Sequence, residues 1–145
     1  MPSADRRADP TLGELFLGAA RAVRRRWVAA LAPWDLPPHQ ARALRVVGDL
    51  EPVRPGVLAE RLHIAPRSVT DVVDALDERG LLTREADPSD RRATVLRLTD
   101  EGWRIRRAIQ SARRDEADEY FAVLSEEDRA TLLRILHELE ESSRD

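Results

Sequence analysis

The residues best suited to chemistry in this sequence are arginines and small hydroxyl residues in two short segments. Arg67, Ser68 and Thr70 lie close together, and the pair Arg91-Arg92 follows later in the chain. A guanidinium is a planar donor that matches the O6 and N7 edge of guanine or two phosphate oxygens, and a hydroxyl binds either a base or a phosphate. Both segments therefore indicate contacts to base edges or phosphates.

Helical spacing of apolar residues predicts the elements that position the first segment. Four helical segments are separated by prolines and a glycine; they begin at Asp9-Pro10, at Pro37-Pro38, after Glu51-Pro52-Val53-Arg54-Pro55-Gly56 and after Ile64-Ala65-Pro66. The third, short helix has Val57, Leu58 and Leu62 as its apolar residues. The fourth buries Val69, Val72, Val73 and Leu76 and ends at Gly80, which leaves an outward face of Arg67, Ser68, Thr70, Asp71 and Asp74.

After Gly80 the pattern changes to two short strands, residues 81–85 and 94–98, followed by two more helices. The charged segment Asp87-Pro88-Ser89-Asp90-Arg91-Arg92 predicts a hairpin with a long tip. Capping signatures at Thr99-Asp100-Glu101-Gly102 and Ser125-Glu126-Glu127-Asp128 begin the last helices. The predicted fold is mainly α (α+β), in the order α-α-α-α-β-β-α-α, with segments 1–36, 37–100 and 101–145 in one compact domain.

A short helix, a tight turn, a second helix and a charged hairpin together predict a winged helix-turn-helix. Its second helix would enter a major groove, and Arg91 and Arg92 on the hairpin would suit a minor groove. Asp90 is expected to orient one of these two side chains; which one enters the groove stays open. An ordinary polar surface helix remains the alternative interpretation.

Composition excludes several functional classes. The 145 residues contain no cysteine, so a disulfide scaffold, a thiolate metal site and thiol redox sensing are excluded. No phosphate loop, nucleophile–base pair or metal cluster is present, and we expect no enzyme and no cofactor. The absence of a long apolar run or a signal peptide predicts a cytoplasmic protein.

Charge is distributed unevenly. The net charge is −3, yet residues 1–54 hold nine arginines and six acidic residues, residues 55–114 twelve and ten, and residues 115–145 three and eleven. Carboxylates of the last segment occur in runs typical of a solvated helix face. The predicted winged helix-turn-helix is therefore slightly basic, although the whole chain is acidic.

Several segments closely resemble the MarR family of bacterial transcriptional regulators, and the resemblance covers about residues 10–142. They are Leu58-Ala59-Glu60-Arg61-Leu62, Ser68-Val69-Thr70, Leu76-Asp77-Glu78-Arg79-Gly80-Leu81-Leu82, Arg84, the charged segment 87–92 and Leu96-Arg97-Leu98-Thr99-Asp100-Glu101-Gly102. The D-P-x-D-R-R wing followed by an L-T-x-x-G helix start is the most diagnostic part.

The resemblance implies a homodimer, held by the first and last two helices, that represses by binding a pseudo-palindromic operator in double-stranded DNA. Arg54 and Arg84 are weaker candidates for phosphate contacts. Ala65 stands where members often have a Ser or Thr cap, and Pro66 partly compensates. Asp71 stands where many members have a basic residue, which alters the contacts expected there.

The resemblance also implies release from DNA by a small aromatic or amphiphilic effector. Trp27, Trp34, His39 and Trp103 are candidates for a ligand pocket, and packing in the core or dimer is the favoured alternative for the tryptophans. His39, His63 and His137 are interpreted as surface residues and not as metal ligands. A winged-helix module that binds protein and not DNA remains the alternative function.

Overall fold

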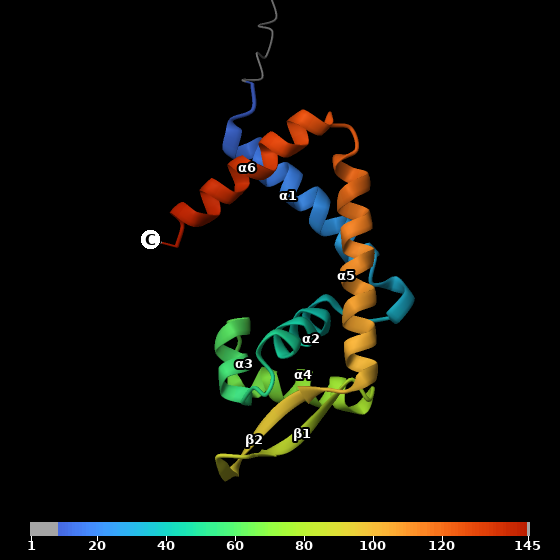
Figure 1. The fold of residues 1–145 in the computed structure, drawn as a ribbon. Coiled ribbons are helices and arrows are strands. Elements are labelled where there is room, and N and C mark those ends of the chain that lie inside the picture. The colour runs from blue at the N-terminus through green and yellow to red at the C-terminus, as the bar shows by residue number, and fades with distance from the viewer. Residues whose placement is uncertain (1–8, 145) are drawn as a thin grey trace, which may run out of the picture. The chain divides into compact units, whose positions relative to one another are not determined.

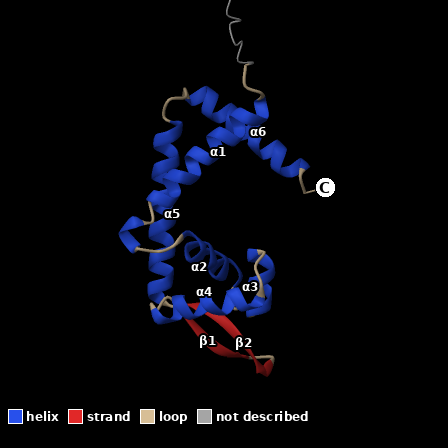
Figure 2. Cartoon of the chain, turned by 180° about the vertical axis from the view of Figure 1, so that it is seen from behind, coloured by secondary structure: helices blue, strands red, loops and turns tan. Residues whose placement is uncertain are grey.

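The computed structural model describes residues 9–144. The elements in chain order are α1 (Leu12–Ala29), the 3-10 helix η1 (Ala32–Trp34), α2 (Pro38–Leu50), α3 (Pro55–Leu62), α4 (Pro66–Glu78), β1 (Leu82–Asp87), β2 (Asp90–Leu98), α5 (Asp100–Phe121) and α6 (Glu126–Ser142) (Figure 1). The order of helices and strands confirms the predicted fold class. Figure 2 distinguishes the two strands, in red, from the helices.

Prolines and small polar residues set the ends of the helices. Proline stands in the first turn of α2, α3 and α4, where its missing N–H costs no intrahelical hydrogen bond. As predicted, the N-cap Ala65 of α4 makes no side-chain cap. The hydroxyl of Ser125, in contrast, accepts a hydrogen bond from the amide of Asp128 at 3.0 Å and caps α6.

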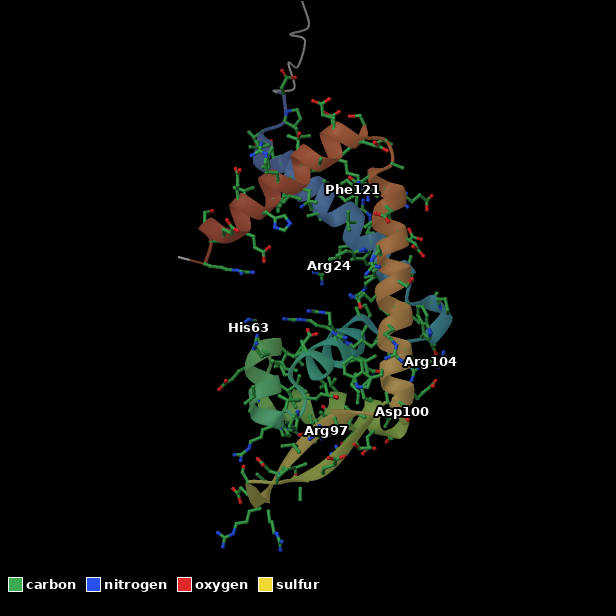
Figure 3. The ribbon with its side chains drawn as sticks, viewed as in Figure 1. Arg24, His63, Arg97, Asp100, Arg104 and Phe121 are labelled. Atoms are coloured by element: carbon green, nitrogen blue, oxygen red, sulfur yellow. The ribbon has the colours of Figure 1, made fainter. Side chains whose placement is uncertain are left out.

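The helix-turn-helix is formed by α3 and α4. His63, at the end of α3, adopts a left-handed conformation with φ 54°, and it marks the turn in Figure 3. The predicted stripe of α4 is buried. In α3, Val57, one of the three apolar residues named from the sequence, is 44% exposed. The helix begins at Pro55 and turns Leu58, Ala59 and Leu62 inward, which leaves Val57 off that stripe.

The hairpin has a short tip and not the long one predicted. Asp87 pairs with Asp90 across the turn Pro88-Ser89, whereas Ala86 pairs with Thr94. Residues 91–93 therefore lie in a register shift, where no residue of β1 is opposite them. The arginine pair is thus displayed by an irregular stretch of β2.

The start of α5 explains why a glycine follows the Leu-Thr pair of the L-T-x-x-G segment. The Thr99 hydroxyl donates to the Gly80 carbonyl at 2.6 Å and accepts a hydrogen bond from the Gly102 amide at 3.0 Å. A Cβ atom at Gly102 would lie only 2.0 Å from the Leu81 carbonyl oxygen. Only glycine lets the first turn of α5 approach this backbone so closely.

The chain divides into two compact units, where sequence analysis expected one domain. Val28–Arg113 forms one unit, called the lobe below; the described residues up to Trp27 and from Arg114 on form the other, called the outer unit. The lobe exceeds the predicted segment 37–100 because Leu31, Leu36, Ile105 and Ile109 belong to its core. Fully buried leucines of α2, α3, α4 and β2 form its centre: Leu44, Leu58, Leu76 and Leu96.

The outer unit is held by polar contacts between helices. Arg26 of α1 donates to Glu116 of α5 at 3.1 Å, and its guanidinium lies 5.8 Å from the centre of the Tyr120 ring. Arg129 of α6 pairs with Asp118 of α5. Neither α1 nor α6 contains a buried residue. Within residues 9–144, no helix has both the length and the apolar character needed to cross a bilayer.

Candidate nucleic-acid interface

The exposed face of α4 carries the candidate base-reading residues. Val69, Val72, Val73 and Leu76 are at most 7% exposed, so the helix is held firmly against the lobe. Arg67, Ser68, Thr70 and Asp71 are all exposed in its first two turns. The Thr70 hydroxyl makes a long hydrogen bond of 3.4 Å to the carbonyl of Pro66, one turn earlier. A rigid helix thus presents a guanidinium, two hydroxyls and a carboxylate to solvent.

Arg84 of β1 is engaged within the lobe. Its guanidinium forms an ion pair with Asp77 at 2.5 Å and another with Asp74, both on α4. Arg84 was predicted to be a candidate phosphate contact; in the structure it connects the wing to α4 by pairing with two carboxylates of that helix. The three side chains are partly exposed, so a phosphate can compete with the two carboxylates for the Arg84 guanidinium.

Arg54 is engaged at the base of the wing in a similar way. Its Nε and Nη2 atoms donate to Oδ2 of Asp87 at 2.9 and 2.6 Å. The other Asp87 oxygen accepts hydrogen bonds from the Ser89 amide at 2.9 Å and its hydroxyl at 2.8 Å. One carboxylate therefore joins the turn of the hairpin to the residue that precedes α3.

These bonds change the acidity of Asp87. Hydrogen bonds from the backbone and hydroxyl of Ser89, followed by that from Arg54, lower the pKa of Asp87 to about 2. Asp87 belongs to the charged wing segment, but no role was predicted for it from the sequence. An Asp followed by Pro-Ser is a typical turn signal, but the partner Arg54 lies 33 residues away and depends on the fold.

The arginine pair on the wing differs from the other arginines of the hairpin. Arg91 and Arg92 are exposed, and neither forms an ion pair with any residue between 9 and 144. Arg97, labelled in Figure 3, pairs across the strands with Glu85 at 3.0 Å. The Asp90 carboxylate accepts a hydrogen bond from the backbone amide of Arg92 at 3.1 Å, whereas sequence analysis expected an arginine side chain as its partner. The carboxylate thus shapes the turn and leaves both guanidinium groups available.

Two of the four candidates for a ligand pocket, Trp34 and Trp103, have packing roles in the lobe. The Trp103 indole donates to Glu51 at 3.2 Å, and the Arg106 guanidinium lies 5.0 Å from its ring centre. Trp34 packs against the core, and His39 is exposed. Trp27, in the outer unit, is 37% exposed. Packing, the favoured alternative for the tryptophans, thus accounts for Trp34 and Trp103.

A different part of the lobe contains a hollow that sequence analysis did not predict. Its volume is about 170 Å³, and it is lined by Arg42, Arg45, Val46, Asp49, Leu50 and Arg61. Three arginines and one aspartate thus line it; Arg45 pairs with Asp49 at 3.8 Å, and Arg42 donates to the Leu62 carbonyl at 3.1 Å. Trp34, His39 and Trp103 do not line it. The spacing of Arg42 and Arg45, three residues apart on α2, was the signal in the sequence that could have indicated this hollow. Arg61 lines it only because of the way α3 packs against α2.

Comparison with known proteins finds a family model and curated relatives that are similar to this chain in sequence. Residues 34–93 match the model of the MarR family. The HTH-type transcriptional regulator MhqR of Bacillus subtilis is 38% identical over 71 residues, which are 49% of this chain and 49% of MhqR. The chain thus spans about half the length of this curated relative.

Solved structures share the fold over most of the chain. A mutant of S. aureus MepR bound to an oligodeoxyribonucleotide has a TM-score of 0.70 at 20% identity, covering 92% of this chain and 99% of MepR. The Mycobacterium tuberculosis MarR family protein Rv2887, in complex with salicylic acid, has a TM-score of 0.72 at 24% identity, covering 90% and 97%. At these identities the similarity shows the fold.

The family match, the regulator homology and the shared fold agree with one another. The matched residues 34–93 include α3, α4 and most of the wing, and with them all of the segments that suggested the family except residues 96–102. The resemblance inferred from those segments is confirmed, since residues 34–93 match the model of the MarR family.

Proposed function

We propose that this protein is a transcriptional repressor that binds double-stranded DNA as a homodimer. The observation that carries the proposal is the joint exposure of the first turns of α4 and of the unpaired Arg91 and Arg92 on the wing. Support comes from MepR, which shares the fold and was solved with an oligodeoxyribonucleotide. Arg67, Ser68 and Thr70 contact the major groove, and the wing contacts the minor groove and backbone.

The homodimer follows from the apolar surface of the outer unit. Leu12 is 85% exposed, and Leu15, Phe16, Leu133 and Leu139 are each more than half exposed. A helical unit without buried residues gains little hydrophobic stabilisation by itself, so a second copy that covers these side chains would stabilise it. Two-fold symmetry then places two recognition helices about one turn of DNA apart, roughly 10 base pairs, and the operator is an inverted repeat.

The proposed effector is a small organic acid that binds the arginine-lined hollow. Burial lowers the pKa of Arg113, and the nearby charge of Arg45 lowers it further. A bound anion would relieve this crowding of cations. Support comes from Rv2887, which was solved with salicylic acid. Release from DNA requires that the acid bind a dimer with wrongly spaced recognition helices more tightly than the DNA-bound dimer.

The test of DNA binding is a titration against a genomic fragment from beside the protein's own gene at several salt concentrations. Phosphate contacts give a steep fall of affinity with salt, about 0.9 logarithmic units per contact and per tenfold change of salt. Protection of an inverted repeat is expected. An affinity that does not depend on salt, or no binding, would favour the protein-interaction module.

A second titration tests the effector. Salicylic acid and related aromatic acids are added to the protein–operator complex, with the wild type and Arg45→Ala compared side by side. The acids are expected to weaken operator binding by the wild type and to have a smaller effect on the variant. A panel of acids that never changes operator affinity would contradict the effector proposal alone.

A further inference from the structure

The exposed face of the recognition helix carries carboxylates that differ in their partners. Asp74 and Asp77 are both paired with Arg84 of β1. Asp71 forms no ion pair or hydrogen bond through its side chain with any other residue between 9 and 144. It is exposed, in the second turn of α4, one turn after Arg67. Asp71 is therefore an uncompensated negative charge in the part of the helix that faces DNA in the proposed complex.

A free carboxylate in that position restricts how the helix meets DNA. Near a phosphate it would be repelled, because both groups are anionic. Toward the base edges it is an acceptor without a donor of its own, so it needs a base that offers an N–H group. Since the apolar stripe of α4 from Val69 to Leu76 is buried in the lobe, the helix cannot rotate to move this position away from the DNA.

The donor pattern of the major groove selects one base for such an acceptor. Guanine offers N7 and O6 and thymine offers O4, all of which are acceptors that repel a carboxylate. Adenine has an N6 amino group beside the acceptor N7, which makes it a poorer partner for a carboxylate. Cytosine offers its N4 amino group alone, and Asp and Glu accept hydrogen bonds from it.

We propose that Asp71 is a specificity-determining residue that accepts a hydrogen bond from the N4 amino group of a cytosine in each half-site. This inference rests on the proposed DNA-binding function. Arg67 and Asp71 are four residues apart, about 6 Å along the helix axis, and base pairs are stacked about 3.4 Å apart. The cytosine therefore lies within one or two base pairs of the guanine that Arg67 contacts.

The experiment selects bound sequences from a random duplex library with purified full-length protein. It compares the wild type with Asp71→Asn, Asp71→Ala and the control Glu78→Gln. Glu78 is an exposed carboxylate at the other end of α4, so the control removes the same charge far from the first turns. Thermal melting of each variant checks that the fold is unchanged, which we expect because Asp71 has no partner to lose.

The wild type is expected to require cytosine at one symmetric position of each half-site, with roughly tenfold or greater loss of affinity when that base is changed. Asp71→Ala should remove the preference at that position, and Asp71→Asn should shift it toward adenine, whose N6 and N7 match an amide. Glu78→Gln should leave it unchanged.

Two results would overturn the proposal in distinguishable ways. If the wild type binds DNA but both Asp71 variants keep its base preference and only gain affinity uniformly, Asp71 acts through charge alone and the inference is wrong. If the wild type selects no sequence and binds no duplex, the proposed DNA-binding function itself fails, and the specificity of Asp71 fails with it.

Discussion

The lobe and the outer unit both contain regular helices with apolar side chains, but they use those side chains in opposite ways. Every buried hydrophobic residue among residues 9–144 lies between Leu31 and Ile109, inside the lobe. In the outer unit, Leu12, Leu133 and Leu139 remain more than half exposed although their helices are regular. Regular secondary structure therefore does not imply a core.

The difference teaches which part of the chain can be stable alone. Burial of a leucine stabilises by about 1.5–3 kcal/mol, and the lobe buries many. The outer unit relies on pairs such as Arg26 with Glu116, both about one-third exposed, and such surface pairs contribute about 0–1 kcal/mol each. The lobe has its own source of stability, whereas the outer unit needs a partner surface.

The largest expected effect comes from deleting residues 126–145, which removes α6. The remaining apolar surface of the outer unit would lose part of its partner interface, so monomer or aggregate should replace the dimer and operator affinity should fall strongly. Analytical ultracentrifugation and DNA titration measure both. A soluble dimer with unchanged DNA affinity would contradict the proposed role of this helix.

A matched pair of leucine substitutions sharpens the comparison. Leu76→Ala, at a fully buried position, should destabilise the fold by about 2–5 kcal/mol at any protein concentration. Leu133→Ala, at a position 59% exposed in the single chain, should instead weaken association, so its effect on unfolding should depend on protein concentration. Denaturant unfolding at two concentrations distinguishes them. Identical behaviour of the two variants would remove the distinction between the units.

Substitutions on the proposed DNA-binding surface should lower affinity without changing the oligomeric state. Arg67→Ala should cost about 1–3 kcal/mol of operator binding and relax the base preference at one symmetric position of each half-site.

Arg92→Ala should weaken binding to all DNA sequences nearly alike and reduce the slope of log affinity against log salt concentration by about 1. Operator and scrambled DNA at several salt concentrations provide the measurement. If neither Arg91→Ala nor Arg92→Ala weakens binding, the hairpin is not a DNA-binding wing.

The smallest expected effect concerns the pH dependence of the wing. The pKa of Asp87 is lowered to about 2 in the folded protein, from an ordinary value of 3.8. Because the folded value lies below the unfolded one, the stabilisation is present above about pH 4 and is lost as pH falls toward 2. Asp87→Asn should therefore be less stable than the wild type at neutral pH, and the difference should shrink in acid. Thermal melting from pH 7 to pH 2 tests this; a constant difference would contradict it.

Helix positions and faces could be predicted because they depend on near neighbours in the sequence. The stripe of Val69, Val72, Val73 and Leu76 follows the helical period, and its burial fixes which residues face solvent. The cap at Ser125 and the glycine in the first turn of α5 are similarly local signals. The sequence alone was therefore enough to identify the candidate residues Arg67, Ser68 and Thr70.

The length of the wing tip and the partners of its charges could not be predicted. Whether Arg91 and Arg92 lie in a loop or a strand depends on the register of two strands, which pattern alone leaves open by a few residues. Phosphate contacts were expected for Arg54 and Arg84, and an arginine side chain was expected as the partner of Asp90. In the structure, each of the three side chains instead has another partner within the lobe. Opposite charges pair wherever the fold brings them within reach.

The sequence by itself determined the resemblance to the MarR family, the order of elements and the outward face of α4, because periodicity, prolines and caps act over a few residues. Tertiary structure decided which arginines stay available for DNA. Arg54 meets Asp87 across 33 residues and Arg84 meets Asp74 across ten, whereas Arg91, Arg92 and Asp71 meet no counterion between residues 9 and 144. Such choices depend on distances that exist only once the hairpin has packed against α4.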